Sequence, residues 1–491
     1  MIARDTRLYL LAAASVSLLL FAIFKHFYPY PNMVMDSYVY LNAAVHHWGA
    51  NSYPIGYSKF LEWFLQCSHS STLLVWIQYL LLETSCSLLF LTVTYFFKPS
   101  KPIQCILLLF LFCNPLWMFT SNFIMSDGLY TAISMFWITQ LIWIIGLPRP
   151  YLIWTNATLL LLAFAIRPNA VYYPLIASLV ILLSAFPLRT KVIGILLQVV
   201  LIGLFVQYTR IETKQLTSIK QFSPLGGWHM ANNALYMYSH IYLENKDPVP
   251  EKFLQLDSVV RDYFDHTKHP VEVLELDARN GFGGYYLDDR TSPLYKYMNW
   301  KYGYDTLFTN FRKWGPVGQL YGEYGTYLIG HHPLSFLQYY ALPNTERYLW
   351  PPAEVFSLYT PFFMRSDNFG KMAGQSFQLK TITVTSRLIN LRTTILSYYP
   401  TIFGLLNILL VLAVIGFLLF RGMQNTNKIT LYILSTIAFL FLFNFLFSVA
   451  AASIVLRYEL FMLIILFVFD VLLLEIVYNL TTTPKPVLDC L

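Results

Sequence analysis

The chain has 491 residues, of which 56% are hydrophobic and only 12% are charged. A soluble globular domain carries roughly twice that share of charged residues, so the composition excludes an ordinary soluble protein. The formal net charge is +7, but the basic residues are scattered over short connections, which does not favour nucleic acid as a partner. The five cysteines form no CxxC pair, so neither a zinc site nor a disulfide framework is predicted.

Long apolar segments recur along the chain and predict an all-α polytopic membrane protein with about ten transmembrane helices. The predicted spans are residues 8–27, 72–97, 103–120, 128–146, 151–166, 170–186, 192–209, 398–420, 429–448 and 453–478. They define an N-terminal transmembrane module (1–209), an intervening region (210–397) and C-terminal transmembrane helices with a short cytoplasmic tail (398–491). The intervening region is polar, aromatic and rich in glycine clusters, and it is too long for a linker, so we expect a folded insert of mixed structure.

The basic residues predict how the spans are oriented. If the spans alternate in direction, six connections with lysine or arginine fall on one side, which the positive-inside rule makes cytoplasmic. The residues in these connections are Arg4, Arg7, Lys98, Lys101, Arg149, Arg189, Lys191, Arg421, Lys428 and Lys485. The extracytoplasmic side then holds the first outer loop (28–71) and the insert. No GxxxxGK[ST] loop occurs in the chain, so an ATP-driven machine is not indicated.

The first outer loop carries an acidic residue, Asp36, directly outside the first span. A carboxylate beside the hydrocarbon layer is costly, so its presence calls for a reason. We predict a helix over Asp36–Trp48 that places Asp36 and Tyr40 on one face, followed by a turn and a second amphipathic helix over Tyr57–Leu65. The alternative is that Asp36 only caps the N-terminus of its helix.

Three more charged residues stand at the ends of predicted spans on the same side. Asp127 opens the fourth span and is alternatively a helix cap. Arg167 precedes Pro168, where a helix should break, and is alternatively an interfacial arginine that extends towards water. Arg457 lies in the outer turn of the last span and needs an acidic or phosphate partner, because Glu459 is only two residues away and cannot face it on a helix.

Two carboxylates and two arginines at one membrane surface suit a reaction on a phosphate-linked lipid. A carboxylate can activate a hydroxyl group, and a guanidinium matches the oxygens of a phosphate. We therefore assign Asp36 as the general base, and Arg457 and Arg167 as phosphate-binding residues. Asp127 is assigned to orienting the acceptor or to binding Mg²⁺ or Mn²⁺ together with Asp36, although two acids alone do not define a metal site. Further candidates are Lys59 for the phosphate and Tyr40, Tyr57, Tyr458, His331 and His332 for substrate.

The two histidines lie in a segment, Leu328–Tyr340, that has the pattern of an amphipathic helix at the membrane interface. We therefore expect His331 and His332 to belong to that helix. The alternative is that they bind the donor.

The order of these motifs resembles a known family. A DSxxY helix at Asp36 and a tyrosine–proline–glycine turn after the first span resemble the first outer loop of the C-type (GT-C) glycosyltransferases. The SxxxxSD element ending at Asp127, the RP corner at Arg167 and the RY pair at Arg457 follow in that family's usual order. The chain is most similar to bacterial relatives of the protein O-mannosyltransferases and of the lipid A aminoarabinose transferases. The region 210–397 matches nothing in the family.

The resemblance implies a GT-C-like fold, a polyprenyl-phosphate sugar donor and an acceptor that arrives from outside, whether lipid, glycan or protein. It also implies that Asp36 is the main catalytic carboxylate and that the enzyme works at the extracytoplasmic face of the bacterial inner membrane. Two other classes stay open. A lipid or solute transporter would also have many spans and charges, although its polar groups usually lie near the bilayer midplane. A non-catalytic assembly subunit would use the insert for binding.

Overall fold

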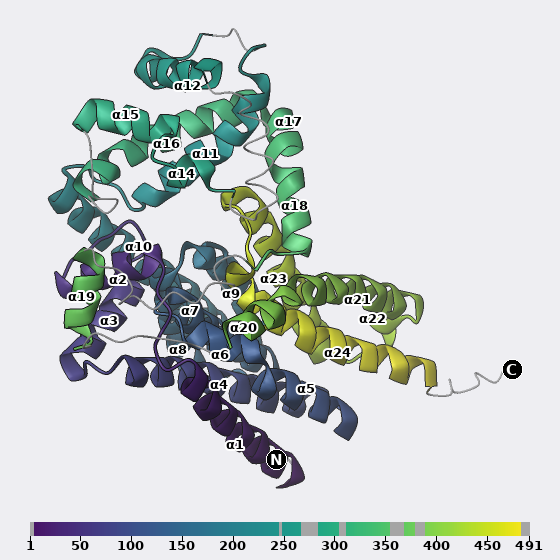
Figure 1. The fold of residues 1–491 in the computed structure, drawn as a ribbon. Coiled ribbons are helices and arrows are strands. Elements are labelled where there is room, and N and C mark those ends of the chain that lie inside the picture. The colour runs from purple at the N-terminus through teal and green to yellow at the C-terminus, as the bar shows by residue number, and fades with distance from the viewer. Residues whose placement is uncertain are drawn as a thin grey trace, which may run out of the picture.

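The computed structural model describes residues 4–244, 248–266, 283–303, 311–353, 368–378 and 388–482. Every regular element in these ranges is a helix, with one isolated bridge between Asn32 and Phe123. Helices from both ends of the chain form one bundle, and the helices of the insert form a second layer at one end of it (Figure 1). The predicted all-α character of the membrane-spanning part is therefore confirmed for the described residues.

Eight helical segments in the described ranges are long and apolar enough to cross a membrane. They comprise α1 (Arg4–Phe27), α4 (Ser71–Phe97), α5 with α6 (Lys101–Cys113 and Pro115–Ser121), α7 (Ser126–Gly146), α10 (Leu188–Thr217), α20 with α21 (Ile389–Ser397 and Tyr399–Leu419), α23 (Lys428–Ala451) and α24 (Leu460–Thr482). The short α22 (Gly422–Asn425) lies between α21 and α23. These helices fit a multi-pass membrane protein.

The fifth and sixth predicted spans are shorter helices, α8 (Tyr151–Ile166) and α9 (Tyr173–Leu183), joined by the 3₁₀ turn η1 (Pro168–Tyr172). At a rise of about 1.5 Å per residue, neither helix alone reaches across the roughly 30 Å of a hydrocarbon layer. The chain instead breaks at Arg167 and Pro168, where proline disfavours the helical conformation of the residue before it. This break inside the bundle is what places Arg167 beside the functional residues.

The helices of the bundle differ in how much of their surface is covered. In α7 and α24, 72% and 67% of the most apolar stretch is buried, whereas in α10 the share is 17%. The exposed residues of α10 between 192 and 204 are all apolar, so this part of the helix fits one that faces lipid. Two predicted site residues lie at the ends of the central helices α7 and α24. Asp127 is in the first turn of α7, and Arg457 lies just before α24.

The insert has a hydrophobic core of its own, built from tryptophan, tyrosine and phenylalanine side chains. Its helices are α11 (Pro224–Ile241), η2 (Glu251–Phe253), α12 (Leu254–His266), α14 (Tyr285–Asp288), α15 (Pro293–Tyr302), α16 (Phe311–His331), α17 (Pro333–Phe336), the π-helical turn η3 (Leu337–Ala341) and α18 (Leu342–Leu349). The helix α19 (Asn368–Ser376) packs against α2 (Met35–Val45). The described part of the insert is thus helical rather than mixed. Since α10 continues to Thr217, the second core begins at α11 and not at residue 210.

Two glycines of the insert lie where the helices α11 and α16 pack closely together. A Cβ atom added at Gly227 of α11 would lie 1.7 Å from the carbonyl oxygen of Gly318 on α16, and one added at Gly318 would lie 2.6 Å from the carbonyl oxygen of Pro224. These glycines let two helix backbones pack against each other, as small residues do at close helix crossings. The contact fixes α11, whose first two turns face the bundle.

Candidate functional site

Asp36 is not the cap of its helix. The helix α2 begins at Met35, and its start is completed by Ser37, whose Oγ accepts a hydrogen bond of 3.0 Å from the backbone N–H of Val34. Asp36 accepts two hydrogen bonds through its carboxylate instead. The Tyr53 hydroxyl donates to Oδ1 at 2.7 Å, and Nη1 of Arg457 donates to Oδ2 at 2.7 Å. The turn and the last span therefore meet at this carboxylate.

Arg457 lies outside the last helix rather than in its first turn. It belongs to the 3₁₀ turn η6 (Leu456–Tyr458), in the connection between α23 and α24. Two asparagines of the insert bind this connection. The side-chain amides of Asn233 and Asn344 donate hydrogen bonds to the carbonyl oxygens of residues 449–452 at 2.8–3.0 Å. Carbonyl groups at a helix C-terminus lack partners within the helix, so these bonds both complete α23 and position Arg457.

The second acid also pairs with an arginine. Nη1 of Arg167 lies 2.9 Å from Oδ1 of Asp127, and the two residues are only 8% and 3% exposed. Asp127 stands in the first turn of α7, whose N-cap position is Met125, so it is not the capping residue. Arg167 is extended at the end of α8, with φ −145° and ψ 143°. It points into the protein instead of extending to the surface, because the break at Pro168 turns it towards α7.

Tyr458 joins the two ion pairs. Its ring centroid lies 4.8 Å from Cζ of Arg167 and 4.7 Å from Cζ of Arg457, and its hydroxyl accepts a hydrogen bond of 2.9 Å from Nη2 of Arg457. Two guanidinium groups on one aromatic ring are favourable only where acids balance their charges, as Asp36 and Asp127 do here. We call Asp36, Asp127, Arg167, Arg457 and Tyr458 the paired-charge cluster.

Three members of the cluster, Asp36, Arg167 and Tyr458, border a cavity of about 290 Å³ between the bundle and the insert, close to the lower end of the size range of small-molecule sites. Three groups of residues line it: the first outer loop, the break after α8, and the facing parts of α11, α23 and η6. The lining residues are Asp36, Tyr40, Tyr53, Pro54, Ile166, Arg167, Pro168, Asn169, Ser223, Leu225, Gly226, His229, Met230, Phe447, Ser448, Ala451, Ala452, Ile454, Tyr458 and Glu459. Tyr40 also ties α2 to α7, with its hydroxyl 3.0 Å from Oγ of Ser126.

The protonation of the cavity residues follows from their surroundings. Burial acts to raise the pKa of Asp36, but the charge of Arg457 and the hydrogen bonds from Arg457 and Tyr53 outweigh it and lower the pKa below its usual value. Burial lowers the pKa of His229 to about 4, although the charge of Asp36 acts in the opposite direction. At pH 7 the cavity therefore holds an ionised carboxylate beside a neutral imidazole.

Sequence reasoning missed two residues of this cavity as functional candidates. His229 lies on α11, in the region without a recognised motif, and only the fold brings it near Asp36. Glu459 was considered only as a partner for Arg457. In the structure it is 0% exposed, and neither of its carboxyl oxygens has a hydrogen-bond partner. Its neighbour in sequence, Tyr458, was the available signal, since both lie at the entry to the last helix.

Six of the ten predicted site residues do not line the cavity. Asp127 and Arg457 are joined to the lining residues Arg167 and Asp36 by ion pairs. The other four lie elsewhere. Lys59 pairs with Glu62 at 2.7 Å on α3 (Gly56–Cys67). Tyr57 is fully buried beneath Tyr40, and its hydroxyl donates to Oε1 of Gln78 at 2.7 Å. The other two are His331 and His332, at the end of α16 and the start of α17.

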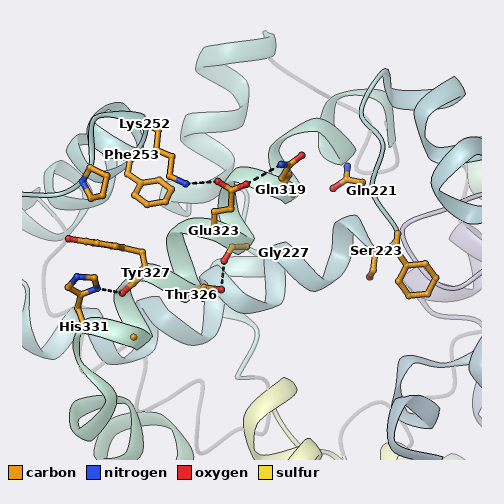
Figure 2. A pocket seen from close by; sticks show the side chains of 15 residues that line it. Gln221, Ser223, Gly227, Lys252, Phe253, Gln319, Glu323, Thr326, Tyr327 and His331 are labelled. Atoms are coloured by element: carbon orange, nitrogen blue, oxygen red, sulfur yellow. Dashed lines mark hydrogen bonds and ion pairs between the residues drawn. The ribbon is translucent and has the colours of Figure 1, made fainter. Parts of the chain in front are cut away.

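His331 borders a different groove, of about 780 Å³, between α11, η2 and α16. Figure 2 shows His331 turned towards Tyr327 on this groove, with Lys252 and Glu323 joined by an ion pair on the same wall. Ser223 borders both the groove and the cavity. The groove is thus a neighbouring feature of the insert and holds none of the paired-charge cluster.

The described residues do not fit a resident divalent cation. Asp36 and Asp127, the two proposed metal ligands, are each occupied by an arginine at 2.7 and 2.9 Å. No group of three or more His, Cys, Asp or Glu side chains in the described ranges is placed to hold a metal ion. Mg²⁺ and Mn²⁺ require several oxygen ligands, so the chemistry of this site is derived from its side chains alone.

Comparison with protein-family models, with curated proteins and with solved structures found no match to this chain.

Proposed function

We propose that the chain is an integral-membrane glycosyltransferase of the GT-C type, which moves a sugar from a polyprenyl-phosphate donor to a hydroxyl group of an acceptor. One observation carries the proposal. Two arginine–carboxylate pairs converge on Tyr458 beside a cavity of small-molecule size at one end of the helix bundle. This arrangement supplies an anion-binding group and a proton acceptor within the same site.

The arginines bind the donor phosphate. A guanidinium has five N–H donors in a planar fork, which matches the oxygens of a phosphate. A lipid phosphate entering the cavity gains charge-assisted hydrogen bonds from Arg457 and Arg167. The phosphate is also the leaving group, so the same arginines stabilise the negative charge that develops on it as the bond to the sugar breaks.

Asp36 accepts the proton of the attacking hydroxyl. The acceptor oxygen forms a bond to the anomeric carbon, the bond from that carbon to the phosphate oxygen breaks, and the proton passes to Asp36. While Asp36 is paired with Arg457 its lowered pKa makes it a weak base. When Arg457 turns to the donor phosphate, the carboxylate loses its strongest partner and becomes more basic. Donor binding thus prepares the base, and the chain catalyses transfer only with the donor in place.

The distribution of lysine and arginine favours the extracytoplasmic face as the side on which the cavity lies. The donor enters from the bilayer beside the bundle, and the acceptor, a lipid, glycan or protein, enters from the insert side. Since α11 lines the cavity, the insert contributes to acceptor choice.

The proposal is tested with the purified full chain in liposomes that contain a radiolabelled polyprenyl-phosphate sugar and a membrane extract as the source of acceptor. We expect label to pass from the lipid phosphate to a new product, and Asp36→Asn to reduce the rate by about a hundred-fold or more. A transporter would move the intact donor across the bilayer without releasing its sugar. An assembly subunit would do neither. Label that stays on the lipid phosphate with every sugar tried would contradict the proposal.

A further inference from the structure

We propose that Glu459 and Ser448 form a subsite of the same cavity that hydrogen-bonds a hydroxyl group of an uncharged sugar ring. The inference rests on the proposed function and deepens it, because it assigns the part of the cavity that recognises the transferred sugar. It starts from one feature of the cavity wall. Both carboxyl oxygens of Glu459 and the hydroxyl of Ser448 are buried without a hydrogen-bond partner.

The tyrosine hydroxyls around Glu459 form hydrogen bonds with other residues, and the Ser448 hydroxyl is the one that acts on its carboxyl group. Tyr348 donates to Oδ1 of Asn444 at 2.8 Å, and Tyr172 accepts a hydrogen bond from Nδ2 of the same Asn444 at 3.0 Å. Tyr130 donates to the Tyr173 hydroxyl at 2.9 Å. Buried polar groups are almost always hydrogen-bonded, and an unpaired one at a cavity wall calls for a ligand.

The charges of the site favour the neutral form of this carboxyl group. The positive charge of Arg167 acts on Glu459, but Asp127 already balances that charge at 2.9 Å. The pair of Asp36 and Arg457 is balanced in the same way. An ionised Glu459 would therefore add an unbalanced negative charge to a site that receives a phosphate. Burial raises the pKa of Glu459, and the Ser448 hydroxyl and Arg167 offset only part of this effect.

A neutral carboxyl group selects the class of ligand. It offers one O–H donor and a carbonyl acceptor, and the serine hydroxyl beside it adds one donor and further acceptor sites. These groups complement a hydroxyl of a sugar, which donates and accepts at the same time. A cationic ligand group would need an ionised partner, and a second anion would compete with the donor phosphate for Arg167. The apolar neighbours Phe447, Ala451 and Ile454 suit the carbon face of a ring.

Two variants with opposite expected results test the subsite. Glu459→Gln keeps a neutral donor and acceptor in nearly the same shape, whereas Glu459→Leu keeps the volume and removes both. Asp470→Leu is the matched control, because Asp470 on α24 is also 0% exposed with both carboxyl oxygens unpartnered but does not border the cavity. Removing an unpaired buried carboxyl should not unfold the chain, and thermal unfolding of each variant verifies this.

The measurement is the dissociation constant of the full chain in detergent for farnesyl phosphate and for farnesyl phosphates that carry a hexose, an N-acetylhexosamine or a pentose. We expect the wild type to bind one sugar-bearing lipid more tightly than farnesyl phosphate. Glu459→Leu should lose about ten-fold of that advantage, which corresponds to one hydrogen bond, while Glu459→Gln and Asp470→Leu keep it. Binding of farnesyl phosphate itself should be unchanged in all three variants.

Each other result has one meaning. If Glu459→Leu keeps the full preference for the sugar, the subsite is overturned while the proposed function stands. If Glu459→Gln loses as much as Glu459→Leu, the carboxyl group acts as an anion and the assignment to a hydroxyl is overturned. If the wild type binds neither kind of lipid phosphate, the proposed function fails and the subsite fails with it.

Discussion

The ion pair between Asp36 and Arg457 leads to a quantitative prediction about the free energy of unfolding. Breaking a buried ion pair by removing one partner costs about 3–5 kcal/mol, because the other charge stays buried without compensation. The two side chains are 19% and 11% exposed, so we take the lower part of this range. Arg457→Met should cost about 3 kcal/mol in free energy of unfolding. Asp36→Asn should cost about 2 kcal/mol, because asparagine still accepts a hydrogen bond.

The double variant Asp36→Asn/Arg457→Met should cost about 3 kcal/mol, which is about 2 kcal/mol less than the sum of the single changes. The assay is equilibrium unfolding of the detergent-solubilised full chain by sodium dodecyl sulfate. The control cycle uses Lys59 and Glu62, whose ion pair is more exposed, with 38% of the lysine side chain accessible; its coupling should stay below about 1 kcal/mol. If the costs at Asp36 and Arg457 add within about 0.5 kcal/mol, the two residues do not form the pair on which the site is built.

Three further predictions concern the surroundings of the cavity. Because the pKa of Glu459 is raised from 4.5 to about 8, the folded chain binds more protons than the unfolded chain between these values, so wild-type stability falls there as pH rises. The melting temperature of Glu459→Gln, relative to that of the wild type, should therefore rise from pH 5 to pH 8. A difference in melting temperature that does not change with pH would contradict a neutral carboxyl group at Glu459. Gly227→Ala should cost about 2 kcal/mol or more in thermal unfolding because its Cβ meets backbone, whereas Gly203→Ala, with nothing within 4 Å, should be neutral or slightly stabilising; equal effects would refute the backbone contact. Tyr53→Phe removes a hydrogen bond to Asp36, so the acidic limb of the pH–rate profile should move to higher pH, and an unshifted limb would count against Asp36 as the base.

The charged residues at the ends of apolar segments could be predicted from the sequence because charges are rare beside membrane-spanning segments. Asp36, Asp127, Arg167 and Arg457 each stand next to a long apolar run, where a charge is costly. Sequence could not show which acid pairs with which arginine. Those pairings depend on the break at Pro168 and on the connection held by the insert, and neither follows from local periodicity.

The tertiary contacts of the insert could not be predicted from local sequence patterns. Its glycine clusters are part of the composition that predicts a mixed insert, but Gly227 and Gly318 allow a close contact between two helices that are distant in sequence. His229 reaches the cavity only through that contact. The two-residue spacing correctly predicts that Glu459 does not pair with Arg457. However, Arg457 lies in the turn η6 rather than on a helix, and Glu459 lies in the cavity wall.

The most direct test of the central claim is a structure of the full chain in lipid with undecaprenyl phosphate bound. We expect the phosphate to lie within hydrogen-bond distance of the guanidinium groups of Arg457 and Arg167, beside Tyr458, and Arg457 to have moved away from Asp36. A phosphate bound instead at the apolar groove between α5 and α21, with both arginines still on their carboxylates, would contradict it.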